Sequence, residues 1–428
     1  MRMKKFAAAA LAFSVVTGNF VFDEKVSAAV VAAENILSVT GVAEVFGDGE
    51  KIARAIIEYP KKLDAKKITA EDFEVAGKTI ESVRVEKNRV ILNFANENTA
   101  FDGSLNSRPS RPKNNGGRAG DAPMRSDRKL PDLNFGVEQV GTIFAADGTE
   151  FAPSGRIISA TISAPVVESF RQFEFADAET GAVMPYNIFL PEGYDGEKKF
   201  PLVVFIADAS ANINEVTTPL IQGNGATSFA AAEFQKKHPC IILAPQYTAD
   251  LVDELGMMTT DENVWTRGLT LTKNLIFDVI ERYAVDADRI YGTGQSQGGM
   301  ANIAISDKYP ELFAAQLLVA CQWNVDEMKI LRGKNLWIVV CEGDTKAFPG
   351  MNAAVANWEE LGAKVARNEN FWDSKASVGE LNKAVKKLER QRANINYTVF
   401  AGGNHMYTWS FAYNIDALRD WLFTKKNF

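Results

Sequence analysis

The feature that most constrains the fold is an alternation of short apolar runs and amphipathic segments after Pro165. Apolar strands alternating with amphipathic helices predict the α/β class, with a mostly parallel sheet covered by helices on both sides. The apolar, strand-like runs lie at 184–190, 202–206, 240–244, 290–292, 316–320, 336–341 and 397–400. The clearest helical face, at spacings of three, four and one, contains Leu271, Leu275, Ile276, Val279, Ile280 and Tyr283.

Before Pro165 the apolar residues recur at every second position instead, for example at Ala55, Ile57 and Tyr59. A period of two indicates strands with one buried face, and turn-forming residues such as Gly47-Asp48-Gly49 separate these runs. The segment from about 36 to 163 therefore predicts an antiparallel sandwich of the immunoglobulin-like kind.

A basic segment at 102–131 interrupts this pattern. It is rich in Gly, Pro, Ser, Asn and Arg and has no apolar periodicity, which predicts a mobile surface loop. Its positive charge leaves open a second interpretation, attachment to an acidic cell-wall polymer.

The N-terminus is typical of an export signal. Arg2, Lys4 and Lys5 precede an apolar run at 6–17, and small residues at 27–29 offer a cleavage site. We therefore expect a secreted or cell-surface protein without stable membrane insertion after cleavage. An uncleaved anchor is the alternative, although the run is shorter than a full membrane span.

Charge and residue counts exclude several classes of function. A net charge of -7 argues against nucleic-acid binding, which needs a dominant basic surface. Two histidines and three cysteines are too few for zinc fingers or histidine-rich metal centres, so no metal and no cofactor are expected, although an oxygen-only calcium site stays open. The cysteines lie in or beside apolar runs and are expected to be buried thiols; the alternative is a Cys321–Cys341 disulfide.

The strongest chemical signal is G-x-S-x-G at Gly294 to Gly298, between a predicted strand and a predicted helix. A serine on such a sharp turn needs small residues two positions away on each side, because larger side chains would collide with neighbouring segments. Ser296 is the predicted nucleophile, and the backbone N–H of Gln297 is one predicted oxyanion donor. A glycine-rich turn with an incidental serine, as in nucleotide-binding folds, is the alternative.

A serine nucleophile needs a base, usually histidine, and a carboxylate that orients the base. His405 follows the last predicted strand and is the predicted base, whereas His238 precedes a strand, at the opposite end of the sheet. Asp344 follows a strongly apolar strand and is the predicted acid, with Glu342 as its rival.

The order Ser296, Asp344, His405 is that of the α/β-hydrolases. The chain resembles exported esterases and predicted peptidases that are similar to polyhydroxybutyrate depolymerases and carry an immunoglobulin-like domain in front. This resemblance implies a signal peptide at 1–29, an immunoglobulin-like domain at 30–165 and an α/β-hydrolase catalytic domain at 166–428. Besides the triad, it rests on Glu179-Thr180-Gly181, Leu190-Pro191-Glu192-Gly193-Tyr194, Pro201-Leu202-Val203-Val204-Phe205, Ala244-Pro245-Gln246 and Asp286 with Arg289-Ile290-Tyr291.

The chain departs from its relatives after the third strand, where they place His-Gly and it has Ala207-Asp208-Ala209-Ser210. The second oxyanion donor is therefore predicted to be the backbone N–H of Asp208 or Ala209. The Asp208 carboxylate would oppose an oxyanion unless it points away or is paired. Candidate acyl- or alcohol-pocket residues, for which ordinary packing is the alternative, are Gln246, Trp265, Trp323 and Tyr407.

The leading hypothesis is a secreted serine carboxylesterase that acts through an acyl-enzyme on a small-molecule or polysaccharide-linked ester. A serine peptidase of the same fold and a non-catalytic surface binding protein are the alternatives. The sequence does not predict the oligomeric state. Shielding one side of the catalytic domain is the simplest role for the sandwich.

Overall fold

The computed structural model describes residues 35–95, 130 and 132–427. The predicted signal peptide and all of the basic segment except residue 130 lie outside these ranges, so both remain predictions. Among the described residues, no helix combines the length and the apolar character that a membrane span requires.

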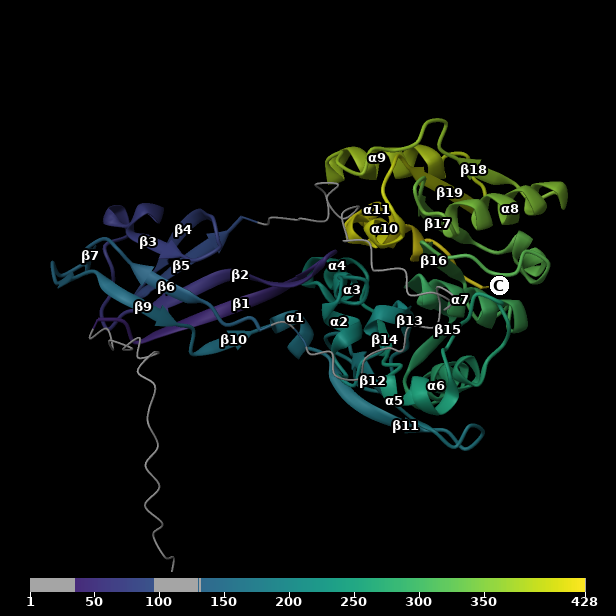
Figure 1. Ribbon diagram of the computed structural model, residues 1–428, viewed down its shortest axis with the longest axis horizontal. Helices are drawn as coiled ribbons and strands as arrows, with labels where there is room; N and C mark the ends of the chain where they lie inside the picture. Colours follow the sequence, from purple (N-terminus) through teal and green to yellow (C-terminus); the bar gives the residue numbers. More distant parts are fainter. Residues whose placement is uncertain (1–34, 96–129, 131, 428) are drawn as a thin grey trace, which may run out of the picture.

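The described strands before Pro165 form β-sheets that pack on a shared apolar core, and these strands are called the sandwich below (Figure 1). The largest sheet has the order β10-β1-β2-β5-β4, and the smaller ones have the orders β3-β6-β9 and β7-β8. Their pairings are antiparallel except for β1 with β10. The bounds are β1 (Ser38–Phe46), β2 (Gly49–Glu58), η1 (Ala65–Lys67), η2 (Ala70–Asp72), β3 (Phe73–Val75), β4 (Ile80–Glu86), β5 (Arg89–Phe94), β6 (Gly136–Gln139), β7 (Ile143–Phe144), β8 (Glu150–Phe151), β9 (Ser154–Ile158) and β10 (Thr161–Ser163).

The period-two pattern identified the inward side chains of the sandwich. Ala55, Ile57 and Leu92 are buried in its core, whereas their neighbours along each strand are more exposed. Tyr59 is also buried and donates a hydrogen bond of 2.9 Å to the Oε1 atom of Gln139, which joins the two larger sheets.

From Pro165 onward the chain forms a nine-stranded sheet with helices on both faces, and this region is called the α/β domain below (Figure 1). The strand order is β11-β12-β14-β13-β15-β16-β17-β19-β18, and every pairing from β14 to β18 is parallel. The fold class predicted from the sequence is confirmed. The strand bounds are β11 (Arg171–Ala176), β12 (Val183–Phe189), β13 (Phe200–Ile206), β14 (Ile241–Pro245), β15 (Val285–Gln295), β16 (Ala315–Val319), β17 (Leu336–Cys341), β18 (Val365–Arg367) and β19 (Ile395–Phe400).

Two apolar clusters cover the opposite faces of this sheet. One includes the buried sides of α6, α7 and α8, and the other includes α3, α4, α10 and α11. The helix predicted from the apolar periodicity is α6, whose Leu271, Leu275, Ile276 and Val279 are buried. The helical bounds are α1 (Pro165–Glu168), η5 (Ala209–Ala211), α2 (Thr218–Ile221), α3 (Thr227–Ala230), α4 (Ala232–Lys237), α5 (Ala249–Leu255), α6 (Arg267–Arg282), α7 (Gln297–Lys308), η6 (Glu327–Gly333), α8 (Ala347–Glu360), α9 (Val378–Glu389), α10 (His405–Ala412) and α11 (Asp416–Leu422).

The three cysteines are buried free thiols, as the sequence predicted. Cys321 and Cys341 therefore do not form the alternative disulfide. Each follows or ends an apolar strand, where burial raises the pKa of the thiol above its ordinary value.

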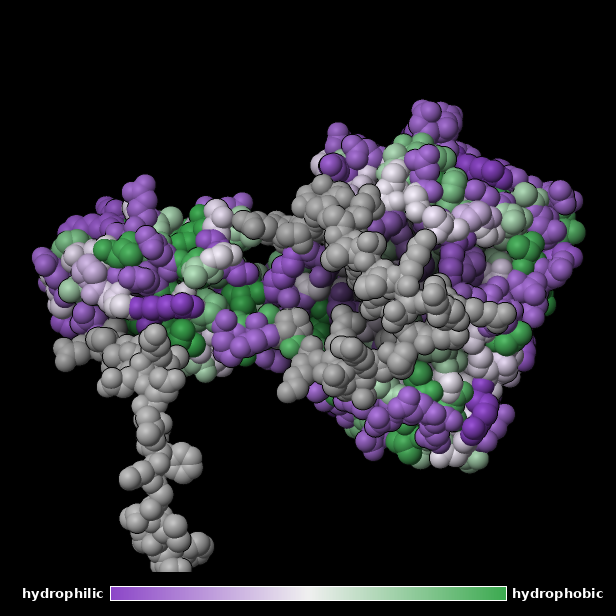
Figure 2. All heavy atoms as spheres, in the orientation of Figure 1, coloured by the Kyte–Doolittle hydropathy of each residue, from purple (hydrophilic) through white to green (hydrophobic). Residues whose placement is uncertain are grey.

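The tip of the β1–β2 hairpin reaches the α/β domain (Figure 1). A Cβ atom at Gly47 would overlap the backbone carbonyl group of Ser410 in α10. A Cβ atom at Gly49 would lie 3.6 Å from the carbonyl oxygen of Ile221, at the end of α2. The hairpin tip therefore packs between these two segments. Figure 2 shows polar side chains over both regions on the face in view, with apolar residues in small separate patches.

Candidate active site

The loops that follow β13, β15, β17 and β19 gather at one edge of the sheet, because these strands run in the same direction. Ser296 lies at this edge, between the end of β15 and the start of α7. Its backbone has φ 50° and ψ -122°, a left-handed conformation that residues other than glycine rarely adopt. Its N–H donates to the carbonyl oxygen of Val319 at 3.0 Å, which fixes the turn to β16.

The two glycines of the motif are required by close backbone contacts. A Cβ atom at Gly298 would overlap the carbonyl oxygen of Ile206, at the end of the neighbouring β13. A Cβ atom at Gly294 would lie 2.5 Å from the same oxygen and 2.7 Å from the carbonyl carbon of Gly298. The collision that the sequence predicted is thus with the neighbouring strand and with the start of α7.

Ser296, His405 and Asp344 form a continuous hydrogen-bonded chain. The Nε2 atom of His405 lies 2.7 Å from the Oγ atom of Ser296, and its Nδ1 atom lies 2.6 Å from the Oδ2 atom of Asp344. When the ring proton is on Nδ1, the ring donates to Asp344 and accepts from the Ser296 hydroxyl. That arrangement allows the imidazole to take the serine proton.

Asp344 is held as a buried carboxylate. Its side chain is 1% exposed, and its Oδ1 atom accepts the N–H groups of Lys346 at 3.1 Å and Ala347 at 2.9 Å. Burial by itself would raise the pKa of Asp344, but the hydrogen bond and charge of His405 and these two N–H groups outweigh it and hold the pKa below its ordinary value. The acid therefore remains ionised at neutral pH.

Glu342, the rival acid, points elsewhere. It is exposed, and its Oε2 atom accepts the N–H of Gly402 at 3.0 Å, which braces the loop that leads to His405. Gly343 sits against the carbonyl oxygen of Gly403, so the acid loop and the histidine loop are in direct contact.

His405 begins α10, and the side chain of Asn404 caps this helix by accepting the N–H of Tyr407 at 2.9 Å. The Trp409 ring packs edge-on against the imidazole, with ring centroids 5.3 Å apart. These contacts restrict the orientation of the His405 ring.

The other histidine, His238, pairs with Asp420 at 3.0 Å and stacks on Phe423 at 4.6 Å. It caps the C-terminal end of α4 and precedes β14, at the end of the sheet opposite to the triad. Its position agrees with the structural interpretation that the sequence favoured.

The predicted oxyanion donors follow the ends of two paired strands, β13 and β15. Gln297 is the first residue of α7 and Ala209 the first residue of η5. Within the described part of the chain, neither backbone N–H donates to a protein acceptor, and the same is true of Asp208. The N–H of Ser210 donates to the Oδ1 atom of Asp208 at 2.7 Å, so this amide is already used.

The Asp208 carboxylate is hydrogen-bonded within the protein, as it has to be if its charge is not to oppose an oxyanion. It is 4% exposed, and its Oδ2 atom accepts hydrogen bonds from the side-chain amides of Gln222 and Gln295, the latter at 3.3 Å. Neutral N–H donors on both oxygens direct the carboxylate into the protein rather than toward a substrate carbonyl.

The four candidate pocket residues are engaged in contacts within the protein. Gln246 is 1% exposed and donates to the carbonyl oxygens of Ala211 and Ile213, so it supports the loop after η5. The polar atoms of the other three bond to neighbouring side chains: Trp265 to Thr270, Trp323 to Glu327 and Tyr407 to Ser374. Their role as pocket residues stays a prediction.

Sequence reasoning missed three residues of this site. Gln222 lies in an irregular loop that carries no recognisable pattern, and Trp409 has the features of any apolar helical residue. Gln295 lies inside the G-x-S-x-G motif, next to Ser296, and its polarity at a fully buried strand end is the one signal that could have drawn attention to it.

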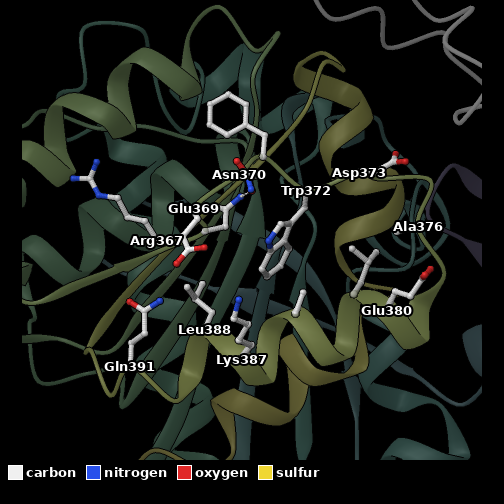
Figure 3. A pocket seen from close by; sticks show the side chains of 14 residues that line it. Arg367, Glu369, Asn370, Trp372, Asp373, Ala376, Glu380, Lys387, Leu388 and Gln391 are labelled. Atoms are coloured by element: carbon white, nitrogen blue, oxygen red, sulfur yellow. Dashed lines mark hydrogen bonds between the residues drawn. The ribbon is translucent and has the colours of Figure 1, made fainter.

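A separate open cavity of about 390 Å³ lies beside β18 and α9 (Figure 3). Trp372 projects into it from the segment after β18, and Lys387 and Leu388 of α9 face the indole ring (Figure 3). None of the triad residues lines it. Among the described residues, no group of three or more His, Cys, Asp or Glu side chains could hold a metal ion.

We compared the chain with known protein families and with solved structures. Residues 38–152 match the family described as the esterase Ig-like N-terminal domain. The chain is similar to a solved structure described as a thermostable esterase, with 22% identity and a TM-score of 0.70 over 91% of this chain and 100% of that chain. The chain has no significant match among curated proteins.

Weaker similarity extends to two further solved structures. One is a feruloyl esterase module from Clostridium thermocellum, with 14% identity and a TM-score of 0.40 over 60% of this chain and 88% of that chain. The other is a poly(3-hydroxybutyrate) depolymerase from Bordetella parapertussis, with 14% identity and a TM-score of 0.37 over 61% of this chain and 93% of that chain.

The family match identifies the N-terminal region, and the first structural match shows the fold of nearly the whole chain. The resemblance to esterases with an immunoglobulin-like N-terminus is therefore confirmed. Residues 38–152 are thus similar to the esterase Ig-like N-terminal domain, and the chain shares its α/β fold with the thermostable esterase.

Proposed function

We propose that this protein is a secreted serine carboxylesterase. The observation that carries the proposal is the unbroken chain from Ser296 through His405 to Asp344, with contacts of 2.7 and 2.6 Å. The esterase-type domain at 38–152 adds support for ester chemistry, and the basic and apolar N-terminal run supports export.

In the proposed acylation step, the Oγ atom of Ser296 attacks the ester carbonyl carbon while its proton passes to the Nε2 atom of His405. The buried Asp344 carboxylate stabilises the resulting imidazolium. The N–H groups of Gln297 and Ala209 donate to the developing oxyanion. His405 then gives the proton to the departing alcohol, and the acyl group remains on Ser296.

Deacylation repeats these steps with water as the nucleophile. His405 takes a proton from the water as it attacks the acyl-enzyme, and returns that proton to the Oγ atom of Ser296 as the carboxylic acid leaves. The half-exposed His405 ring, with 37% of its side chain accessible, lets water reach this position. We expect small-molecule or polysaccharide-linked esters as substrates.

A fluorophosphonate probe tests the nucleophile directly. We expect the wild type to be labelled and Ser296→Ala to be unlabelled, with both proteins folded by circular dichroism. An unlabelled, folded wild type would overturn the proposal and would favour the non-catalytic binding protein.

A substrate comparison then tests the reaction class. p-Nitrophenyl esters of increasing acyl length should be hydrolysed, with a preferred chain length, and aminoacyl anilides should be hydrolysed far more slowly. Faster cleavage of the anilides would instead assign the protein as a peptidase. The mature N-terminus of protein recovered from culture medium tests export, and cleavage near residue 29 is the expected result.

A further inference from the structure

The two proposed oxyanion donors belong to different segments of the chain. Gln297 follows Ser296 in the turn between β15 and α7, called the Ser296 turn below, whereas Ala209 is the first residue of η5, after the neighbouring strand β13. A misplaced donor loses most of its effect, because a hydrogen bond weakens steeply as its distance and angle depart from their optimum. Contacts between the Ser296 turn and η5 therefore bear on the distance and angle between the two donors.

The first such contact is made by the residue before the nucleophile. The side-chain amide of Gln295 donates to the Oδ2 atom of Asp208 at 3.3 Å, and Asp208 in turn caps η5 by accepting the N–H of Ser210. Both side chains are almost fully buried, with Gln295 1% and Asp208 4% exposed.

The second contact is made by the residue after the nucleophile. The side-chain amide of Gln297 donates to the Oδ1 atom of Asn212 at 3.1 Å, and Asn212 directly follows η5. These two side chains are also buried, 3% and 2% exposed. The residues on both sides of Ser296 thus reach the two ends of the same short helical turn.

A third donor secures Asp208 from outside. The side-chain amide of Gln222 also donates to Oδ2, and Gln222 directly follows α2, where its carbonyl oxygen lies 3.8 Å from the position of a Cβ atom at Gly49. The β1–β2 hairpin tip therefore packs over the segment that carries this donor.

Burying the Asp208 carboxylate costs free energy of folding unless hydrogen bonds compensate its charge. The three hydrogen bonds to the buried Asp208 carboxylate come from neutral N–H groups, those of Ser210, Gln222 and Gln295. Two of its three donors come from side chains outside its own turn. A carboxylate that only capped η5 would not need the two side-chain donors Gln222 and Gln295.

We propose that Asp208 is a positioning residue that, together with the Gln297–Asn212 contact, fixes the Ala209 N–H relative to the Gln297 N–H as a two-donor oxyanion hole. This inference rests on the proposed esterase function. Asp208 and its hydrogen bonds would then take the place of the His-Gly element that the relatives have at this point. Gln295 and Gln222, which donate to Asp208, would help to hold it in position.

The test compares steady-state kinetics of the wild type, Asp208→Ala, Asp208→Asn and Gln222→Ala on a p-nitrophenyl ester. We expect Asp208→Ala to lower kcat by about 10- to 100-fold with KM nearly unchanged, because losing a donor outright typically costs about 100- to 1000-fold. Asp208→Asn should recover much of this loss, since Asn also caps a helical turn. Gln222→Ala, at a half-buried position, should lower kcat by about 3- to 10-fold and provides a readout if Asp208→Ala does not fold.

Asp177→Ala is the matched control. Asp177 is also buried, caps its own turn through the N–H of Thr180 at 2.9 Å and accepts from an amide side chain, Asn274, at 2.8 Å, but it lies between β11 and β12. It should lose thermal stability and keep the wild-type kcat.

Affinity for an alkyl boronic acid, which forms a tetrahedral adduct with the serine, adds a readout that a purely structural role would not change. It should weaken in Asp208→Ala in parallel with kcat, while the affinity for the carboxylate product stays the same. An active wild type with Asp208→Ala and Gln222→Ala within about twofold of it would overturn this inference alone. An inactive and unlabelled wild type would overturn the proposed function as well.

Discussion

The sandwich and the α/β domain bury their strands in different ways. In β2 of the sandwich, half-buried residues separate the buried ones, whereas β13 and β17 of the α/β domain are buried along their whole length. The buried polar side chains differ as well. In the sandwich, Gln139 bonds to Tyr59 and joins two sheets, whereas Asp208, Gln295, Gln297 and Asp344 all lie where α/β strands end. The region with the proposed chemistry therefore contains several buried polar side chains that make hydrogen bonds.

The largest expected effect comes from the nucleophile. Ser296→Ala should lower kcat by a factor of about 10⁴ or more, because the remaining groups cannot replace covalent catalysis. Ester hydrolysis at saturating substrate measures this loss. Ser159→Ala is the counterpart in the sandwich: its hydroxyl is buried and accepts the N–H of Phe135 at 3.4 Å, so it should reduce the melting temperature and leave kcat unchanged. Equal activity losses in both variants would contradict the division of roles.

The second-largest loss of kcat is expected for substitution of the acid, Asp344. Asp344→Asn should lower kcat by about 10⁴-fold, because an amide disfavours the ring tautomer that the reaction needs. Glu342→Gln, two residues away and directed at the N–H of Gly402, should retain most of the activity. Kinetics of the two variants side by side measure the difference. If Glu342→Gln proved the more damaging, the assignment of the acid would be wrong.

The contact between the two regions should give a smaller effect. Gly47→Ala places a methyl group against the carbonyl of Ser410, so the hairpin tip or α10 must move, at a cost of about 1–3 kcal/mol in the free energy of unfolding. Since α10 also carries His405, we expect kcat/KM to fall by about 3- to 10-fold. Thermal unfolding and ester kinetics measure both quantities.

Gly155→Ala is the matched control for this contact, because a Cβ atom there meets nothing within 4 Å. It should have little effect on either quantity. A Gly47→Ala variant that behaved like Gly155→Ala would show that the hairpin tip is not coupled to the α/β domain.

The last prediction concerns the pH dependence of stability, without an expected effect on kcat. Both carboxyl oxygens of Asp307, near the end of α7, are buried and have no hydrogen-bond partner among the described residues. Burial, with a further contribution from the charge of Glu327, raises the pKa of Asp307 to about 8. The native protein therefore keeps a proton that the unfolded chain loses near pH 4, so the free energy of unfolding falls as the pH rises from about 4 to about 8.

Asp307→Asn removes this dependence, because an amide does not ionise. The gain in melting temperature over the wild type should be larger at pH 8 than at pH 5. The same substitution at the exposed Asp253 should give no such difference. A gain that was equal at both pH values would contradict the raised pKa.

The sequence predicted most of the fold because periodicity depends on local packing. The β17 bounds agree with the predicted run, and those of β12, β13 and β14 lie within about two residues of it. Two edge strands were missed. The residues of β11 are mostly exposed and lack a continuous apolar run, and β18 has three residues, too few for a pattern.

The triad positions could be predicted because each has a local signature: the glycines around Ser296, the loop that carries His405, and the apolar strand before Asp344. The structure brings these three together. The partners of Asp208 could not be predicted, because Gln222 and Gln295 reach it only through tertiary packing. The hydrogen bonds of Gln246 to Ala211 and Ile213 could not be predicted for the same reason, since its neighbours set the direction of its side chain.

The left-handed backbone of Ser296 has a consequence for the evolution of such a protein. A non-glycine residue in that conformation costs about 1–3 kcal/mol, and glycine would relieve most of it. Ser296→Gly should therefore melt at a higher temperature than the working sequence while having no nucleophile. Selection for thermal resistance alone would therefore favour glycine at this position, at the expense of the proposed nucleophile.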